Sequence, residues 1–153
     1  PLAVVWTALS GWGAGQTATA YERAFQLTQS MDSPPELFQI MYGLSTTRWL
    51  RDEFLEGLTI AKGLAAYSDT AGDQAGYVLA HRTYGGALCW VPDYEKSKLH
   101  LENSIAAYDT LESQSFIQDT GSDPKAVSLV VLAAVYAYSG YPDRAANLLQ
   151  NGL

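Results

Sequence analysis

Apolar residues along most of this chain recur every three or four positions, which is the period of an α-helix. Leu37, Ile40 and Leu44 follow this spacing within residues 34–50. No stretch shows the alternation with period two that is typical of a strand. Helices are therefore predicted over residues 17–29, 34–50, 54–69, 74–90, 93–109, 123–140 and 141–153.

Small residues recur at matched places in these helices. Four positions where a helix should meet its successor, and the positions twelve residues after each, all hold Ala, Gly or Ser. Small side chains let two antiparallel helices approach closely, so we predict an all-α, tetratricopeptide-like superhelical array of about four antiparallel helix pairs. The array is expected to form a single domain over residues 1–153. The eight positions are Ala8, Ser45, Gly85 and Ala133, followed by Ala20, Gly57, Ser97 and Ala145.

Three alternating glycines near the amino terminus, in "LSGWGAGQTAT", resemble a nucleotide-binding loop at first sight. A phosphate loop counted from Gly11 requires a glycine and then a lysine at positions that hold Gln16 and Thr17. The dinucleotide fingerprint fails at Gln16 as well. The glycines are therefore predicted to form the turn between two helices.

Composition and charge narrow the class of protein. The chain has 153 residues, is 48% hydrophobic and 16% charged, and carries a net charge of −7. Because it has no basic run, we expect no binding of nucleic acid. Its longest apolar stretch, residues 126–138, is too short to cross a membrane, and no signal peptide is present. The lone Cys89 fits a reducing compartment, so we predict a cytoplasmic fragment of a longer multidomain protein.

Short motifs occur in an order that is similar to a known family. The chain resembles the tetratricopeptide-like C-terminal region of bacterial adenylate/guanylate cyclase–ATPase fusion proteins and of related predicted-ATPase regulators. Departures at Asp52-Glu53 and Ile117, where the family usually has glycine, affect the expected loop shapes only. The matching motifs are Ala20-Tyr21-x-Arg23-Ala24, Pro35-Glu36-Leu37-Phe38, Tyr42-Gly43-Leu44, Ala80-His81-Arg82-x-x-Gly85, His100-Leu101-Glu102, Ala107-Tyr108-Asp109, Gln118-Asp119 and Gly140-Tyr141-Pro142-Asp143-x-Ala145.

The resemblance implies a regulatory or partner-binding region, with the catalytic cyclase and ATPase modules outside this chain. The residues themselves give no sign of catalysis. His81 and His100 do not follow a zinc-binding pattern, and Cys89 is interpreted as a small buried residue. We therefore predict no enzyme activity, no catalytic residue, no metal and no cofactor.

A binding surface is the remaining hypothesis. Trp12, Trp49, Trp90 and Tyr138 occupy nearly the same place in all four predicted repeats. Aromatic residues and arginine are enriched at interface hot spots. In one interpretation these aromatic side chains line a concave groove, and in the other they close the ends of the helix pairs as part of the core. Further candidates on the same helices are Tyr42, Arg48 and Arg82.

Two details of this surface stay open. Arg82 either grips a ligand carboxylate or forms a structural ion pair with Asp119 or Glu102. The long predicted loop, residues 110–123, is a candidate lid over the groove, because loops of this length in compact domains are often functional. It would present Phe116, Gln118 and Asp119.

The predicted function is therefore a protein-interaction or regulatory module of a bacterial signalling protein. Its partner would be a peptide, another domain or the upstream ATPase or cyclase module of the same chain. One alternative is a small-molecule sensor with an aromatic–arginine pocket for an anionic metabolite. A second is self-association through the C-terminal helix, where the leucines are Leu148, Leu149 and Leu153.

Overall fold

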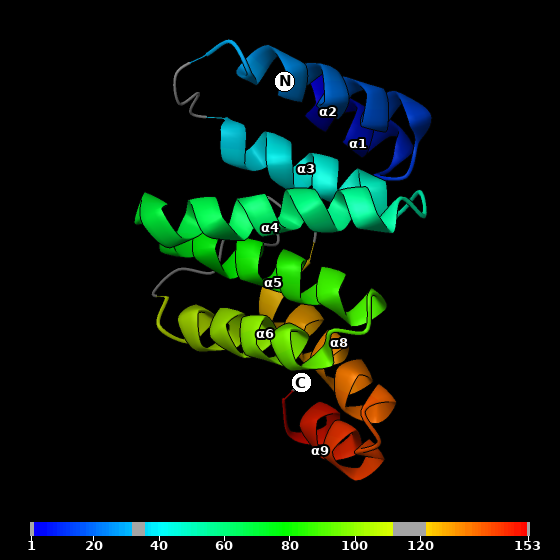
Figure 1. Ribbon diagram of the computed structural model, residues 1–153, viewed down its shortest axis with the longest axis vertical. Helices are drawn as coiled ribbons and strands as arrows, with labels where there is room; N and C mark the ends of the chain where they lie inside the picture. Colours follow the sequence, from blue (N-terminus) through cyan, green and yellow to red (C-terminus); the bar gives the residue numbers. More distant parts are fainter. Residues whose placement is uncertain (1, 32–35, 112–121, 153) are drawn as a thin grey trace. The chain divides into compact units, whose positions relative to one another are not determined.

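The computed structural model describes residues 2–31, 36–111 and 122–152. These residues form eight α-helices and no β-strand, which confirms the all-α prediction (Figure 1). The helices are α1 (Leu2–Ser10), α2 (Gly15–Thr28), α3 (Leu37–Trp49), α4 (Phe54–Ala71), α5 (Gln74–Trp90), α6 (Tyr94–Tyr108), α8 (Pro124–Tyr138) and α9 (Pro142–Gly152).

The chain divides into two compact units. The N-terminal unit is Pro1–Leu64 and the C-terminal unit is Ala65–Leu153, so α4 contributes residues to both. The prediction of a single domain over residues 1–153 stays a prediction.

In the N-terminal unit, α2 packs against both α1 and α3. The core is formed by Ala3 of α1, Tyr21 of α2 and Leu44 of α3, with Ile60 of α4 packed against it. The glycine stretch forms the turn between α1 and α2, and Gly11 takes a left-handed conformation there (φ +81°). The helix–turn–helix prediction is thereby confirmed.

The predicted small residues do lie at the contact between paired helices. Ser45 of α3 donates a hydrogen bond to the Gly57 carbonyl of α4 (3.1 Å), and Ser97 of α6 donates to the Gly85 carbonyl of α5 (2.7 Å). The two hydrogen bonds require a close approach of the backbones, so the prediction is confirmed in the pairs α3/α4 and α5/α6. In the last pair, α8 packs against α9, and the predicted Ala133 and Ala145 are both buried.

The first pair differs. Ala8 is exposed, so its predicted place in the helix contact is wrong. The only buried residue of α1 is Ala3, which belongs to the same core cluster as Tyr21. Because α1 ends at Ser10, it is too short to repeat the geometry of the other pairs.

The C-terminal unit is built from α5, α6, α8 and α9 together with the end of α4. Its core is formed by Cys89, Leu101, Leu132 and Val135. Three of its helices have an aspartate as N-cap residue: Asp73 precedes α5, Asp93 precedes α6, and Asp123 precedes α8. Each accepts a hydrogen bond from a backbone N–H of the first turn. Such caps supply partners that the first turn of a helix lacks.

Two adjacent glycines of α5 are expected to respond oppositely to alanine. A Cβ at Gly85 would lie 2.8 Å from Leu101 Cγ, whereas a Cβ at Gly86 would meet no atom within 4 Å. We expect Gly86→Ala to stabilise by about 0.5–1 kcal/mol through helix propensity. Gly85→Ala should offset that gain with an overpacking cost of about 1–3 kcal/mol. Thermal unfolding of both variants tests this, and equal shifts would contradict it.

Within the described ranges, no helix combines the length and the apolar character that crossing a membrane requires.

Candidate functional site

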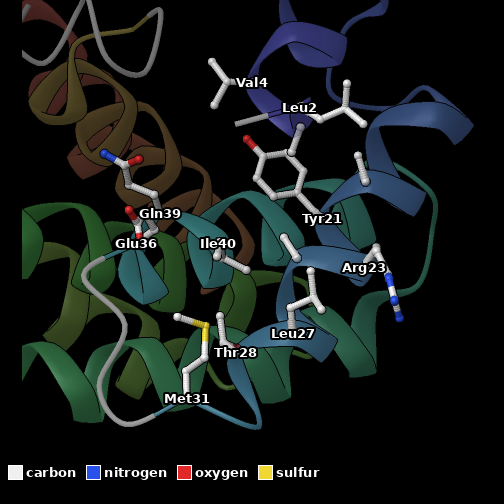
Figure 2. A pocket seen from close by; sticks show the side chains of 13 residues that line it. Leu2, Val4, Tyr21, Arg23, Leu27, Thr28, Met31, Glu36, Gln39 and Ile40 are labelled. Atoms are coloured by element: carbon white, nitrogen blue, oxygen red, sulfur yellow. The ribbon is translucent and has the colours of Figure 1, made fainter.

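An apolar groove lies among the first three helices of the N-terminal unit (Figure 2). We call it the α1–α3 groove, and its volume is about 480 Å³. Its lining comes from α1, α2, the residue after the α2 C-terminal turn, and the start of α3. The lining residues are Leu2, Ala3, Val4, Ala20, Tyr21, Arg23, Ala24, Leu27, Thr28, Met31, Glu36, Gln39 and Ile40.

The sequence of α2 explains why a groove forms here. Ala20, Ala24 and Leu27 recur at helical spacing and therefore lie on one face. The two alanines are small and leave space beside α1 and α3 that longer side chains would fill. Beyond the helix, Met31 extends the same face. The groove is thus a consequence of small residues at one place on an otherwise ordinary helix.

The walls of the groove are unusually exposed for apolar side chains. Leu2 is 66% exposed, Leu27 52% and Met31 55%. Single exposed apolar residues are normal on protein surfaces, but a cluster around a hollow is typical of an interaction site. Methionine at such a place adapts its shape to different partners.

Tyr21 forms the rigid part of the groove and is only 5% exposed. Figure 2 shows it between Leu2 of α1 and Ile40 of α3. Its ring stacks on Trp12 with centroids 5.9 Å apart, and Trp12 in turn meets the edge of Tyr42 at the same distance. Burial raises the pKa of the Tyr21 phenol. The groove therefore has a floor held in place by an aromatic stack.

The polar lining residues are few. Arg23 is exposed and its guanidinium donates to the Gln26 side chain at 3.3 Å. Glu36 and Gln39 also line the groove, and Figure 2 shows Glu36 and Arg23 on opposite sides of it. These groups can orient a bound molecule, whereas the apolar walls supply the contact area.

The aromatic site residues predicted in the N-terminal unit contact other aromatic rings of that unit. Trp12 and Tyr42 belong to the aromatic stack behind Tyr21. Trp49 is the last residue of α3; it contacts the edge of Phe54 at 5.6 Å and lies against Gly57. These three aromatic side chains pack against other rings of the N-terminal unit, and a role for them in binding stays a prediction.

Arg48 is held by three carboxylates. It pairs with Glu22 of α2 at 2.7 Å, with Glu53 in the turn before α4, and with Glu56 of α4 at 3.3 Å. The hydrogen bond to Glu53 is the main cause of the raised pKa of Arg48, and the Arg48 guanidinium lowers the pKa of Glu53. This network joins three helices, and it occupies the guanidinium that was predicted to face a ligand.

The predicted site residues of the C-terminal unit are more exposed. Trp90 ends α5 and Tyr138 ends α8, and both are about three-fifths exposed (62% and 61%). Tyr138 contacts Tyr94 with ring centroids 6.3 Å apart. Arg82 is half-buried on α5.

Most of the candidate lid, together with Asp119 as one expected partner of Arg82, belongs to the undescribed range 112–121. Phe116, Gln118 and Asp119 lie outside the described residues. The leucines proposed for self-association differ in burial. Leu148 packs against the C-terminal core, whereas Leu149 is 38% exposed. Leu153 lies outside the described ranges.

Titratable side chains supply chemistry when several of them gather in one place. Among the described residues, no three or more His, Cys, Asp or Glu side chains gather as metal ligands would. Cys89 is buried, and burial raises the pKa of its thiol, so the unreactive protonated form is favoured. His81 contacts both His100 and Asp69, an arrangement that the sequence patterns did not predict.

Comparisons of this chain with family models, with curated proteins and with solved structures gave no match.

Proposed function

We propose that this chain is a non-catalytic protein-interaction module that holds an amphipathic helix of a partner protein in the α1–α3 groove. The observation that carries the proposal is the open apolar hollow of about 480 Å³ with exposed leucine and methionine walls. Helix-in-groove recognition uses such a surface, because a partner helix inserts apolar side chains at positions i, i+3 or i+4, and i+7.

The dimensions of the groove favour a helical occupant. Its stripe on α2 runs from Ala20 to Leu27, two turns or about 10 Å of helix, and Met31 extends it. A neighbouring helix can follow such a stripe over two to three turns. The charges of Arg23 and Glu36 favour a partner with an acidic residue at one end and a basic residue at the other. Exposed rim charges contribute mainly to orientation.

A small anionic metabolite fits the lining less well. Small-molecule sites place several polar groups toward their ligand. Among the described lining residues the single cation is Arg23, and the predicted aromatic–arginine set of Trp49, Trp90 and Arg82 does not contribute. We therefore favour a protein partner over the metabolite sensor.

We also infer that the helix pairs form a tetratricopeptide-like array in a cytoplasmic, cyclase- or ATPase-linked signalling protein of bacteria. The small-residue contacts in the pairs α3/α4 and α5/α6, together with the buried Ala133 and Ala145 of α8 and α9, support the array. The order of motifs described for the sequence supports the link to signalling proteins. The full reading frame around this segment tests that link directly.

A panel of helical peptides tests the groove. The peptides carry leucine at i, i+3, i+4 and i+7 and differ in the charges at their two ends. We expect NMR shift changes to concentrate on the groove residues of α2. Leu27→Glu, which places a charge on an exposed wall, should weaken binding at least tenfold, because the bound helix would cover the carboxylate with apolar side chains and its desolvation is costly even with Arg23 one turn away.

Leu9→Glu is the matched control. Leu9 is an exposed leucine of α1 in the same unit, but it does not line the groove. Its replacement should leave peptide affinity unchanged. Equal losses in both variants would contradict the proposal. Binding of a medium-chain fatty acid at the groove, with no peptide bound, would overturn it in favour of the sensor.

A further inference from the structure

Three side chains from three helices form a hydrogen-bonded chain in the C-terminal unit. His81 of α5 lies with its Nε2 3.0 Å from Asp69 Oδ1 at the end of α4. On its other side, His81 Nδ1 lies 3.1 Å from Nδ1 of His100 on α6. We call Asp69, His81 and His100 the histidine latch, because it joins the end of α4 to α5 and α6.

Hydrogen-bond chemistry fixes the protons of the latch when both imidazoles are neutral. The Asp69 carboxylate only accepts, so His81 Nε2 carries the hydrogen. Neutral His81 then presents a lone pair at Nδ1, and His100 must donate its Nδ1–H to it. Both imidazoles are neutral in this arrangement, and His100 holds the less common tautomer. The chain of donors runs from His100 through His81 to Asp69.

The surroundings of the latch are confined. His81 is buried, and the Tyr77 ring stacks on it with centroids 3.9 Å apart. Tyr84 packs against His100 at 4.5 Å. Between α6 and α8, Ser104 meets Ser128, and the carboxylate of Glu102 is hydrogen-bonded to the Tyr136 hydroxyl. Among the described residues, Asp69 is the carboxylate that contacts the imidazole pair.

We propose that the histidine latch is an acid-sensitive device that releases the end of α4 from α5 and α6 as the pH falls through the range in which histidine in water titrates. One added proton can be held between the two Nδ1 atoms, with one ring donating and the other accepting, but a second would set two cationic rings with their Nδ1 atoms 3.1 Å apart. A proton on the His100 ring would put a charge beside a buried imidazole. In the opened state both rings are in water and accept protons freely.

The sign of the effect follows from the protonation of His100. Burial, and then the neighbouring His81, lowers the pKa of His100, while Asp69 partly offsets the shift. A histidine with a lowered folded pKa stabilises the closed state above its ordinary value of about 6.5. That contribution is lost as the pH falls through this value, because the opened state binds more protons.

The chain is well suited to a test, because His81 and His100 are its only histidines. Asp and Glu titrate below about pH 5 in water, so the window from about pH 7.5 to 5.5 reports chiefly on the latch. Hydrogen exchange over residues 65–108 measures the opening constant of the latch. We expect this constant to rise about tenfold across this window for each proton that the opened state binds and the closed latch does not.

His100→Gln is the principal variant, because glutamine keeps an N–H donor and does not titrate in this range. Across the same pH window, the factor by which its opening constant rises should be at least ten times smaller than in the unaltered chain. An unchanged pH response would overturn the proposal. The amino terminus also titrates near this window, but it is the same in both chains and cancels in the comparison.

Asp69→Asn provides a second, independent test at an exposed side chain. Asparagine still accepts the His81 hydrogen bond but no longer favours an added positive charge, so the opening constant should rise further, and to lower pH, than in the unaltered chain. Nitrogen NMR of the two imidazoles reads the tautomers directly near neutral pH. We expect Nε2–H on His81 and Nδ1–H on His100; two Nε2–H tautomers would overturn the proposal.

Discussion

Leu101→Ala is expected to destabilise the C-terminal unit by about 2–5 kcal/mol, the largest effect we predict for a single substitution in this chain. Leu101 is fully buried in α6 and forms the core together with Cys89, Leu132 and Val135. The backbone of Gly85 lies directly against its side chain. Because helices already in close contact have little room to move inward, the space left by the leucine stays largely empty.

Native-state hydrogen exchange of the α5, α6 and α8 amides measures this loss locally, which suits a chain with two compact units. Leu99→Ala is the matched control, since Leu99 lies on the same helix and is 54% exposed. Its replacement should change stability by less than about 0.5 kcal/mol. Similar losses of protection in the two variants would show that Leu101 does not anchor this core.

The helices and their pairing could be predicted from the sequence because both depend on local rules. Apolar periodicity identifies a helix wherever the chain continues long enough. Small residues twelve positions apart identify the close contact of two helices joined by a short turn, as Ser45 and Gly57 demonstrate. The rule failed at Ala8, where α1 ends too early and packs through Ala3 instead.

The α1–α3 groove was not predicted, although its signal is present in the sequence. Ala20 was interpreted as a contact between helices and Ala24 only as part of a family motif, whereas the structure leaves the space beside them open. Whether a small residue marks a contact or a hollow depends on the angle and length of the neighbouring helices. Those quantities come from packing over the whole unit and not from local sequence.

The partners of charged and polar residues were also beyond the local pattern. Arg48 was predicted as a binding residue, but the three carboxylates that pair with it come from α2, from α4 and from the turn before α4. The histidine latch could have been found from the helix register. If Gly85 meets Ser97 in an antiparallel pair, then His81, four residues before Gly85, lies opposite the segment that contains His100.

Gly43→Ala is expected to destabilise the N-terminal unit by about 1–3 kcal/mol. A Cβ at this position of α3 would lie 2.1 Å from Tyr21 Cε1 and 2.3 Å from Cζ. The ring cannot easily retreat, because it is buried and stacks on Trp12. Displacing Tyr21 would also disturb the floor of the α1–α3 groove. Hydrogen exchange of the α2 and α3 amides should therefore accelerate, and binding of the groove peptides should weaken.

Gly63→Ala controls for the general effect of replacing a helical glycine in the same unit. The added Cβ would lie 3.3 Å from Met41 Cε, the flexible end of a side chain that can move aside. Its helix propensity gain of up to about 1 kcal/mol should then appear as stabilisation.

In a double variant that combines Gly43→Ala with Tyr21→Leu, the ring that the new methyl group would meet is gone. The two substitutions should thus cost less together than the sum of their separate losses, by about 0.5–3 kcal/mol. Strict additivity would show that the Gly43–Tyr21 contact does not limit the packing of α2 on α3.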